Sequence, residues 1–207
     1  MHQQIRTKVN AMAKEALTNQ FQKPDGHAYQ VRDLTFQFLK ITSLKHVPDF
    51  TFSPREARMV ANAAYLHDVG KLLTPKSILY KRGALTPAER EKLQLHTMDG
   101  AMLLYFCSAY QERLIQRYAF EIALHHHERI DGSGYPDGLK GLDLAPWLQI
   151  VSLADAFAAL MEDRPYRPAH TSQVAWKMIL NGDCGKFNDR ILRCLDDNQN
   201  GWLQDAV

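Results

Sequence analysis

Histidine and aspartate gather at two places in the sequence, in a pattern that is typical of metal-binding sites. His67 is followed by Asp68, and three consecutive histidines at positions 125–127 lead into a glycine-rich segment at 131–138. Imidazole and carboxylate groups bind divalent first-row metals, and a carboxylate has two oxygens with which it can bridge two ions. The sequence therefore predicts an enzyme that uses metal ions for hydrolysis.

The three consecutive histidines cannot all face one site. Successive residues of a helix project about 100° apart around its axis. The glycine-rich motif begins directly after His126 and His127. We therefore expect these two to be metal ligands, and we expect His125 to lie in the core or to support the ligands from behind.

The segment around the His-Asp pair has spacings that suit a shared site. Lys71 is four residues after His67 and three after Asp68, so one helix would turn all three toward a single cleft. Gly70 would leave room for a ligand to approach. An isolated pair of this kind is more often a helix end closed by glycine, with the lysine in solvent. The additional histidines favour the metal site.

Length and composition predict a single domain with a substantial core. The chain has 207 residues, of which 45% are hydrophobic, enough to bury a core of the usual size. Its 25 basic and 23 acidic residues leave a formal net charge of +2. This balance argues against a nucleic acid polymer as partner, because such binding needs clustered basic residues.

No segment is typical of a secretion signal or a membrane span. Met1–Phe21 mixes charged and apolar residues, and the longest apolar run, Ala101–Cys107, is far too short to cross a bilayer. We expect a cytoplasmic protein with no membrane partner. Cys107, Cys184 and Cys194 form no C-x-x-C pair, which indicates reduced thiols rather than disulfides or a zinc site.

Apolar residues recur at spacings of three and four almost everywhere, which predicts an all-α fold. Ser53-Pro54-Arg55-Glu56 has the form of a capping box and predicts a helix that runs to about His67. Thr86-Pro87-Ala88-Glu89 repeats the pattern and predicts a helix that carries His96 toward Cys107. Further helices are expected at about 5–17, 27–38, 112–127 and 147–160.

The domain organisation is simple. Residues 131–146 are rich in glycine and proline and form a loop long enough to suggest a function. No linker or internal repeat divides the rest of the chain. We therefore expect an N-terminal helix at residues 1–22 and one catalytic domain at residues 23–207.

These segments together resemble the HD-GYP domain. His126-His127-Glu128, Asp131-Gly132 and Gly134-Tyr135-Pro136 follow the order of its glycine-rich motif, and His67-Asp68-Val69-Gly70-Lys71 resembles its upstream pair. HD-GYP domains are a branch of the HD hydrolases and cleave the bacterial messenger cyclic di-GMP. The resemblance covers roughly residues 26–187. It implies an all-α, HD-type helical bundle with a glycine-rich GYP loop.

The resemblance also implies a site with two metal ions. The ligands that it implies are His27, His67, Asp68, His96, His126, His127 and Asp155. Asp68 would bridge the ions, with His27, His67 and Asp155 around one and His96, His126 and His127 around the other. Because these ligands offer nitrogen and oxygen but no thiolate, we expect iron or manganese rather than a structural zinc.

Each single ligand has a structural alternative. His27 could be a helix-start residue, His96 a surface histidine, and Asp155 a buried carboxylate with hydrogen-bond partners. Asp155 is the strongest individual candidate, because a carboxylate in the apolar segment 150–160 is costly without a compensating cation or hydrogen bonds. All seven residues fit one register of the motif, which favours the metal site.

Four further residues are candidates for catalysis or substrate binding. Lys71 matches the family lysine that adds positive charge near the attacked phosphate. Arg164 and Arg167 lie in a segment that resembles the family's phosphate-binding segment, and Tyr135 could stack on guanine. The alternatives are a solvated lysine, arginines that cap the preceding helix and a structural tyrosine.

Two positions depart from the family pattern. Some members have glutamate four residues before the first histidine, where this chain has Lys23, and this removes a ligand for a third metal. Many members have aspartate three residues after the later aspartate, where this chain has Ala158. Neither position belongs to the seven proposed ligands.

The resemblance implies a metal-dependent phosphodiesterase that converts cyclic di-GMP to linear pGpG, with GMP as a further product if the enzyme cuts twice. Paired cations lower the pKa of a shared water and neutralise charge on the attacked phosphate. One alternative is a hydrolase of another cyclic dinucleotide or nucleotide. Another is a noncatalytic module that docks on a diguanylate cyclase or another signalling protein through the GYP loop. The complete set of ligands favours the enzymes, and the oligomeric state is left open.

Overall fold

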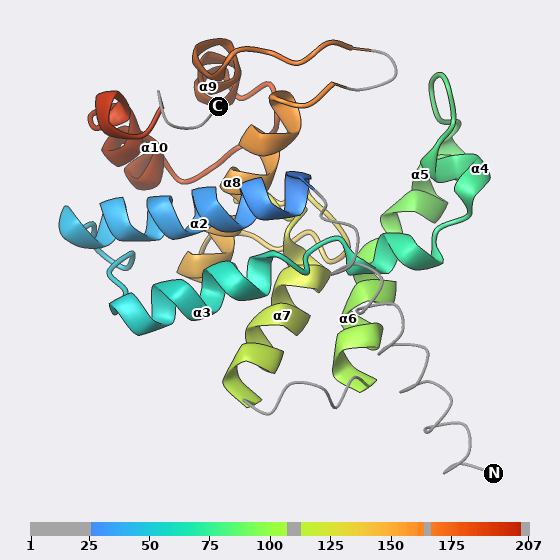
Figure 1. Cartoon of the computed structure of the whole chain (residues 1–207), viewed down its shortest axis with the longest axis horizontal. Coiled ribbons are helices and arrows are strands. Elements are labelled where there is room, and N and C mark those ends of the chain that lie inside the picture. The colour runs from blue at the N-terminus through green and yellow to red at the C-terminus, as the bar shows by residue number, and fades with distance from the viewer. Residues whose placement is uncertain (1–25, 107–112, 164–166, 204–207) are drawn as a thin grey trace.

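The computed structural model describes residues 26–106, 113–163 and 167–203, and within these ranges the chain forms helices and no strand (Figure 1). The prediction of an all-α fold is confirmed. The predicted N-terminal helix at 1–22, Lys23, Cys107 and Arg164 lie outside the described residues. The α-helices are α2 (Gly26–Leu44), α3 (Pro54–Ala64), α4 (Lys76–Leu79), α5 (Pro87–Gln94), α6 (His96–Phe106), α7 (Arg113–His125), α8 (Pro146–Leu160), α9 (Ser172–Asn181) and α10 (Asp189–Asp196). Short 3-10 helices are η1 (Val69–Leu73), η2 (Gly141–Asp143) and η3 (Gln199–Gly201).

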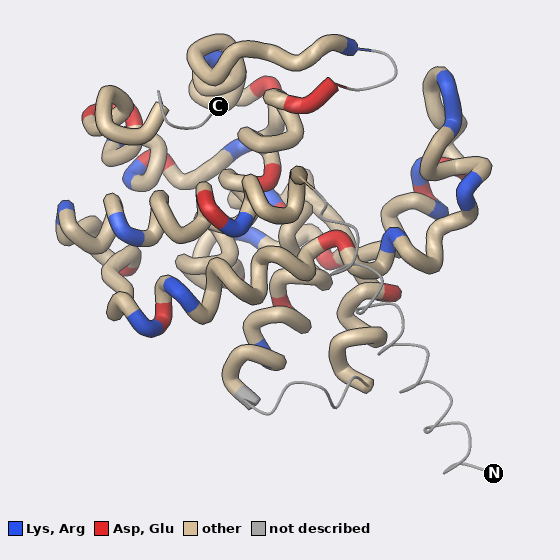
Figure 2. The backbone as a smooth tube through the Cα atoms, viewed as in Figure 1, with Lys and Arg blue, Asp and Glu red and all other residues tan. Residues whose placement is uncertain are grey.

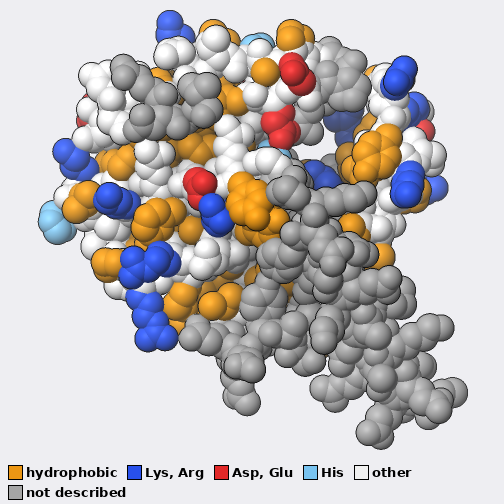
Figure 3. All heavy atoms as spheres, viewed as in Figure 1, with side chains coloured by type: hydrophobic (Ala, Val, Ile, Leu, Met, Phe, Trp, Pro, Cys, Tyr) orange, Lys and Arg blue, Asp and Glu red, His pale blue; other side chains and the backbone are white. Residues whose placement is uncertain are grey.

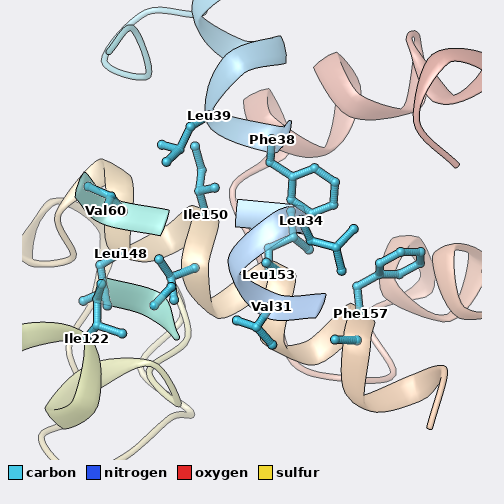
Figure 4. Close-up of a cluster of buried hydrophobic side chains, with 14 of the residues drawn as sticks. Val31, Leu34, Phe38, Leu39, Val60, Ile122, Leu148, Ile150, Leu153 and Phe157 are labelled. Atoms are coloured by element: carbon cyan, nitrogen blue, oxygen red, sulfur yellow. The ribbon is translucent and has the colours of Figure 1, made fainter. Parts of the chain in front are cut away.

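Helix α8 forms the centre of the bundle. Nearly all of its residues are buried, because its sequence is apolar on every side. It packs against α2, whose buried side chains include Val31, Leu34 and Phe38 (Figure 4). Helices α3 and α7 complete the core. An apolar helix of this kind is stable only when other helices surround it, so the bundle has to form around α8.

Aromatic side chains join the C-terminal helices to this core. Trp202 lies edge-to-face against Phe38 of α2 at 4.9 Å between ring centroids, and against Trp176 of α9 at 5.0 Å. Phe157 of α8 contacts both tryptophans. Such large rings bury much apolar surface in a small space, and they fix α9 and the segment after α10 onto α2 and α8.

The predicted helix starts at Ser53 and Thr86 are confirmed. Ser53 accepts a hydrogen bond from the Glu56 N–H, and proline occupies the first helical position. Thr86 and Glu89 form both bonds of a capping box. These side chains satisfy amide groups that have no partner within the first turn of a helix.

The predicted end of the first of these helices is wrong by three residues. Helix α3 ends at Ala64, and residues 65–68 form turns that lead into η1. In η1, Gly70 lies directly on α6, where an added Cβ atom would collide with the carbonyl oxygen of His96. The chain leaves the α-helix early because it must turn to make this contact. The expectation that Gly70 leaves room for a ligand is therefore wrong, since the space is filled by the backbone of α6.

The helix predicted from Thr86 toward Cys107 is two helices, α5 and α6, which separate at Leu95. The side chains of His96 and Thr97 bond the carbonyl oxygens of Leu93 and Gln94. A continuous helix would use such carbonyls for main-chain hydrogen bonds. The side chains compete with the helix at this point, and α6 starts in a new direction.

Helices α4 and α5 form a projection that stands apart from the main body (Figure 1). Several lysine and arginine positions lie along its backbone together with acidic ones, and charged positions of both signs are also spread over the rest of the molecule (Figure 2). The space-filling view shows a hollow between this projection and the body (Figure 3). Among the described residues, no helix is long and apolar enough to cross a membrane.

Candidate metal centre

The structure brings the seven predicted ligands together at one end of the bundle. Six of them lie at or just beyond helix ends, and Asp155 lies in the middle of α8. The positions are the first turn of α2 (His27), the turn after α3 (His67 and Asp68), the first residue of α6 (His96), the turn after α7 (His126 and His127) and α8 (Asp155). Five separate parts of the chain therefore supply the site.

The Asp68 carboxylate is at the centre of the cluster. Its Oδ1 lies 3.2 Å from Nε2 of His96 and 3.6 Å from Nε2 of His126. Its Oδ2 lies 3.3 Å from Nε2 of His67 and also contacts the ammonium group of Lys71. The two oxygens thus face different histidines, which is the arrangement that a bridging carboxylate needs.

The side chains form two groups that share Asp68. In one, the candidate ligand atoms of His96, His126, His127 and Asp68 all lie within 4.8 Å of one another. In the other, those of His27, His67 and Asp68 do so. The histidines fall into the same two groups as in the division that the family resemblance implied, and Asp155 belongs to neither group.

Asp155 reaches the second group from α8. Its Oδ1 lies 3.1 Å from Nε2 of His27 and 3.6 Å from Nε2 of His67, and its Oδ2 lies 3.8 Å from Nδ1 of His127. The carboxylate is buried. His27 bonds one of its oxygens, so the alternative of a buried carboxylate with hydrogen-bond partners is partly correct. Its contacts with both groups place it beside each candidate ion site.

Three of the histidines are held in one orientation by main-chain carbonyls. Nδ1 of His67 lies 2.9 Å from the Ala64 oxygen, and Nδ1 of His96 lies 2.7 Å from the Leu93 oxygen. Nδ1 of His126 lies 3.0 Å from the carbonyl oxygen of Ile122. A carbonyl oxygen only accepts hydrogen bonds, so each Nδ1 must carry the proton. In the neutral rings, each Nε2 therefore turns a lone pair toward the carboxylates.

This arrangement brings acceptors face to face, and it fits bound cations. Nε2 of His67 and Oδ1 of Asp68 are buried, and neither has a hydrogen-bond partner within the described part of the chain. The Nε2 atoms of His96 and His126 lie only 3.4 Å apart. Buried acceptors without donors are costly. A divalent ion between them would satisfy nitrogen and oxygen lone pairs together.

At two positions of the cluster, the electrostatics favour a neutral histidine beside an ionised carboxylate. Burial lowers the pKa of His126 to about 4, against the influence of Asp68. Burial also opposes ionisation of Asp68, but Lys71 and His67 outweigh it and hold the pKa of the carboxyl well below its usual range. The protonation states that metal ligands require are thus already favoured at these two positions.

His27 differs from the other histidines because carboxylates face both of its nitrogens. Nε2 lies 3.1 Å from Asp155, and Nδ1 lies 3.2 Å from Oε1 of Glu162. Burial opposes its charged form, but the bonds to Asp155 and Glu162 are stronger and raise its pKa to about 10. Sequence reasoning missed Glu162, because it matches no position of the motif that indicated the ligands.

His125 lies outside the cluster, although it is next to two of its members. Its Nε2 lies 3.0 Å from Asp137 and its Nδ1 lies 3.3 Å from Glu121. The ring therefore joins α7 to the glycine-rich loop. The three consecutive histidines do not share one site, as predicted. The expectation that His125 lies in the core or supports the ligands is wrong, because its ring is only partly buried and bonds two carboxylates outside the cluster.

Glu128 organises the glycine-rich loop from within. Its side chain is buried, and Oε1 accepts hydrogen bonds from the N–H groups of Asp137 and Gly138 at 2.7 and 3.0 Å. Oε2 accepts a third from the Leu139 N–H at 3.0 Å. Sequence reasoning gave Glu128 no role, although its place directly after His127 was a signal. The carboxylate ties the loop to the turn that carries the ligands.

The loop in turn packs on His127. Gly134 lies so close to the main chain of Glu128 and Arg129 that an added Cβ atom would collide with it. The following residue, Tyr135, stacks on the His127 ring, with centroids 4.7 Å apart and planes inclined by 31°. Burial, Asp155 and Asp68 together raise the pKa of the Tyr135 hydroxyl above its usual value. It is therefore a neutral donor at the edge of the site.

Arg167 does not point its guanidinium group into the cluster. NH1 donates to the Leu160 and Pro168 oxygens at 2.9 and 3.1 Å, and NH2 donates to the Ala159 oxygen at 3.0 Å. It caps the C-terminus of α8, as the structural alternative proposed. Three of the guanidinium N–H groups are bonded to carbonyls, and the phosphate-binding role predicted for Arg167 stays a prediction.

The sequence was compared with known proteins. It matches the family model described as HD domain over residues 12–188. The cyclic di-GMP phosphodiesterase response regulator RpfG of Xanthomonas campestris pv. campestris is 47% identical over 152 residues, which are 73% of this chain and 38% of that protein. A cyclic di-GMP phosphodiesterase of Thermotoga maritima is 44% identical over 117 residues, 56% of this chain and 31% of that protein.

A relative with a different named substrate is also similar. The 3'3'-cGAMP-specific phosphodiesterase 2 of Vibrio cholerae is 43% identical over 140 residues, 68% of this chain and 26% of that protein. The chain thus spans about a third of the length of these curated relatives. Since the family model matches most of the sequence and the motif residues meet in one cluster, the chain belongs to the HD domain family, in its HD-GYP branch.

Proposed function

We propose that this chain is a metal-dependent phosphodiesterase that hydrolyses cyclic di-GMP to linear pGpG, and to GMP if it cuts a second time. The observation that carries the proposal is the convergence of Nε2 atoms of His96 and His126 on Oδ1 of Asp68, a buried oxygen that has no hydrogen-bond partner among the described residues. The named activities of the Xanthomonas and Thermotoga relatives support this substrate.

Two divalent ions fit the cluster, one in each of the groups that share Asp68. Iron or manganese suits a set of nitrogen and oxygen ligands without thiolate. The described cysteines, Cys184 and Cys194, belong to neither group. When bound, such ions would lower the pKa of a shared water and neutralise charge on the attacked phosphate.

The chain's own residues would hold and orient these groups. Asp68 would span both ions through its two oxygens, and Lys71 lies against one of those oxygens. The ammonium group is therefore next to the place where negative charge gathers on a phosphate during attack, and it would stabilise that charge. We assign catalysis to Asp68 and Lys71.

The substrate would enter beside the glycine-rich loop. Tyr135 lies over His127 with a protonated hydroxyl, and it could stack on a guanine base or donate a hydrogen bond to it. Asp131, Ser133 and Asp137 on the same loop are exposed. We propose this exposed part of the loop as the contact for a signalling protein.

A second candidate substrate is 3'3'-cGAMP. The Vibrio relatives that carry this activity in their names include one that is 43% identical to this chain. The two dinucleotides share a phosphodiester ring and differ in one base, so the same cluster would attack either. The base contacts of the pocket would decide between them.

The test is turnover by purified protein whose metal content has been measured. Cyclic di-GMP, 3'3'-cGAMP and cyclic di-AMP are assayed separately, and Asp68→Ala is compared with Glu91→Ala, a change of an exposed carboxylate on α5. We expect turnover of cyclic di-GMP that falls by at least about 100-fold in Asp68→Ala, since metal catalysis contributes several kcal/mol, and that persists in Glu91→Ala. Turnover of 3'3'-cGAMP alone would support the second candidate. Full metal occupancy without turnover of any of the three would contradict both.

A further inference from the structure

The histidines of the cluster differ in the group that bonds Nδ1, the ring nitrogen that faces away from the cluster. In His67, His96 and His126, Nδ1 bonds a main-chain carbonyl three or four residues earlier. Such a carbonyl is available because a helical turn precedes each of these residues. The rings are thus oriented by their own local backbone.

His27, in the first described turn of α2, has a side-chain partner at this nitrogen. Its Nδ1 faces Oε1 of Glu162 at 3.2 Å instead. Glu162 follows the C-terminal end of α8, and its side chain is 31% exposed.

Helix α8 therefore presents a carboxylate to each side of the His27 ring. Asp155, inside the helix, lies 3.1 Å from Nε2, and Glu162, beyond its end, faces Nδ1. The two are seven residues apart, which is about two helical turns. The inner carboxylate belongs to the metal cluster, and the outer one stands at its edge.

We propose that Glu162 is a positioning residue that fixes the His27 ring for metal binding; this rests on the proposed metal centre. Oε1 of Glu162 lies 3.2 Å from Nδ1 and favours a proton on that nitrogen, so that Nε2, the atom that faces the cluster, is the one that gives up its proton to bind a metal. A carboxylate also makes the ring a stronger donor to a metal than a neutral carbonyl does. Glu162 thus does for His27 what backbone carbonyls do for the other three rings.

The test measures binding of Mn²⁺ without substrate, by titration of the metal-free protein in competition with a chelator. Loss of a partner of this kind typically costs 10- to 100-fold in metal affinity. We expect Glu162→Ala to lower the affinity for one of the two ions by about this factor and to leave the affinity for the other unchanged. Glu162→Gln should lower the affinity less, because its amide oxygen can still accept a hydrogen bond from the Nδ1–H group. Glu91→Ala should bind both ions like the wild type.

A double-mutant cycle with His27→Ala separates positioning from a general effect of charge. If Glu162 acts through His27, adding Glu162→Ala to His27→Ala changes Mn²⁺ affinity no further. A further loss in that background would overturn the proposal. So would wild-type affinity in Glu162→Ala, or an equal loss at both ions, which would indicate a damaged fold. Failure of the wild-type protein to bind two ions would remove the proposed metal centre itself, a result that is distinct from these.

Discussion

At the scale of single residues, the environment decides what each histidine does. His125 and His126 are neighbours, yet one joins two surface carboxylates and the other points a lone pair at Asp68. The difference lies in the backbone carbonyl that takes the Nδ1 proton of His126. The same logic applies to carboxylates, since Glu128 binds only main-chain amides while Asp68 faces histidines.

Glu128→Gln tests the role of this buried carboxylate. The amide oxygen can keep two of the three hydrogen bonds, but its NH₂ group would face the Leu139 N–H. We expect the free energy of unfolding to fall by about 2 kcal/mol, the usual contribution of a hydrogen bond to a charged group. Urea denaturation of the metal-free protein measures it. Asp131→Asn, the same change on an exposed loop residue, is the control, and equal losses in both variants would contradict the assignment.

Arg167→Ala distinguishes a helix cap from a phosphate ligand. Because the guanidinium group bonds carbonyls at the end of α8, we expect the free energy of unfolding to fall by about 1–2 kcal/mol. KM for the cyclic dinucleotide should stay within about twofold of the wild type. Arg190→Ala, which removes an exposed ion pair with Asp49, should change neither. A tenfold rise in KM with unchanged stability would support the phosphate-binding role.

At the scale of elements, the site depends on how closely η1 approaches α6. Gly70 lies against the backbone of His96 and Gly100, and an added Cβ at Gly100 would lie 3.1 Å from the Gly70 nitrogen. Asp68 precedes the first glycine by two residues, and His96 precedes the second by four. The glycine contact thus sets the distance between two ligands on different elements.

Gly70→Ala should separate these elements. The methyl group would meet main-chain atoms that cannot rotate away, so we expect a loss of about 3 kcal/mol in the free energy of unfolding, at the upper end for overpacking. Metal content should fall as well, because His96 and Asp68 move apart. Gly201→Ala is the matched control, since nothing lies within 4 Å of its added Cβ, and its effect should be within roughly 0.5 kcal/mol. Equal stability of the two variants would refute the argument.

The sequence predicted the helices better than it predicted their ends. Capping boxes at Ser53 and Thr86 are local signals, and both were confirmed. The early end of α3 and the break at Leu95 depend on contacts with distant segments, which local spacing does not contain. The family motif indicated the seven ligands because each matches one of its positions. It missed Glu162, which matches none of them and meets His27 only in the folded chain.

At the scale of the whole molecule, the bundle buries a cluster of acceptors at one end of its core. The apolar packing of α2 and α8 holds His27 and Asp155 together. It also keeps Nε2 of His67 and Oδ1 of Asp68 buried without hydrogen-bond partners among the described residues, which costs free energy. Bound ions would relieve this cost. Folding stability and metal occupancy should therefore be linked.

Metal removal tests this link. At a free Mn²⁺ concentration 100 times the Kd, each bound ion stabilises the folded state by about 2.7 kcal/mol, so two ions contribute about 5 kcal/mol, which corresponds to roughly 10–20 °C in Tm for a chain of this size. We expect Tm to fall by this amount when a chelator removes the metal, and thermal unfolding measures it. Asp68→Ala should show a much smaller difference between the two conditions. Equal Tm values for metal-loaded and metal-free wild-type protein would show that the cluster does not bind the ions.

The carbonyl bonds to His67, His96 and His126 have a further consequence for the kinetics of metal exchange. These rings lose their rotational entropy when the chain folds, so an arriving ion does not have to order them. The apoprotein is in this sense a preorganised receptor. Reloading the metal-free protein should then proceed without refolding, at a rate set by how quickly the ion sheds its hydration water.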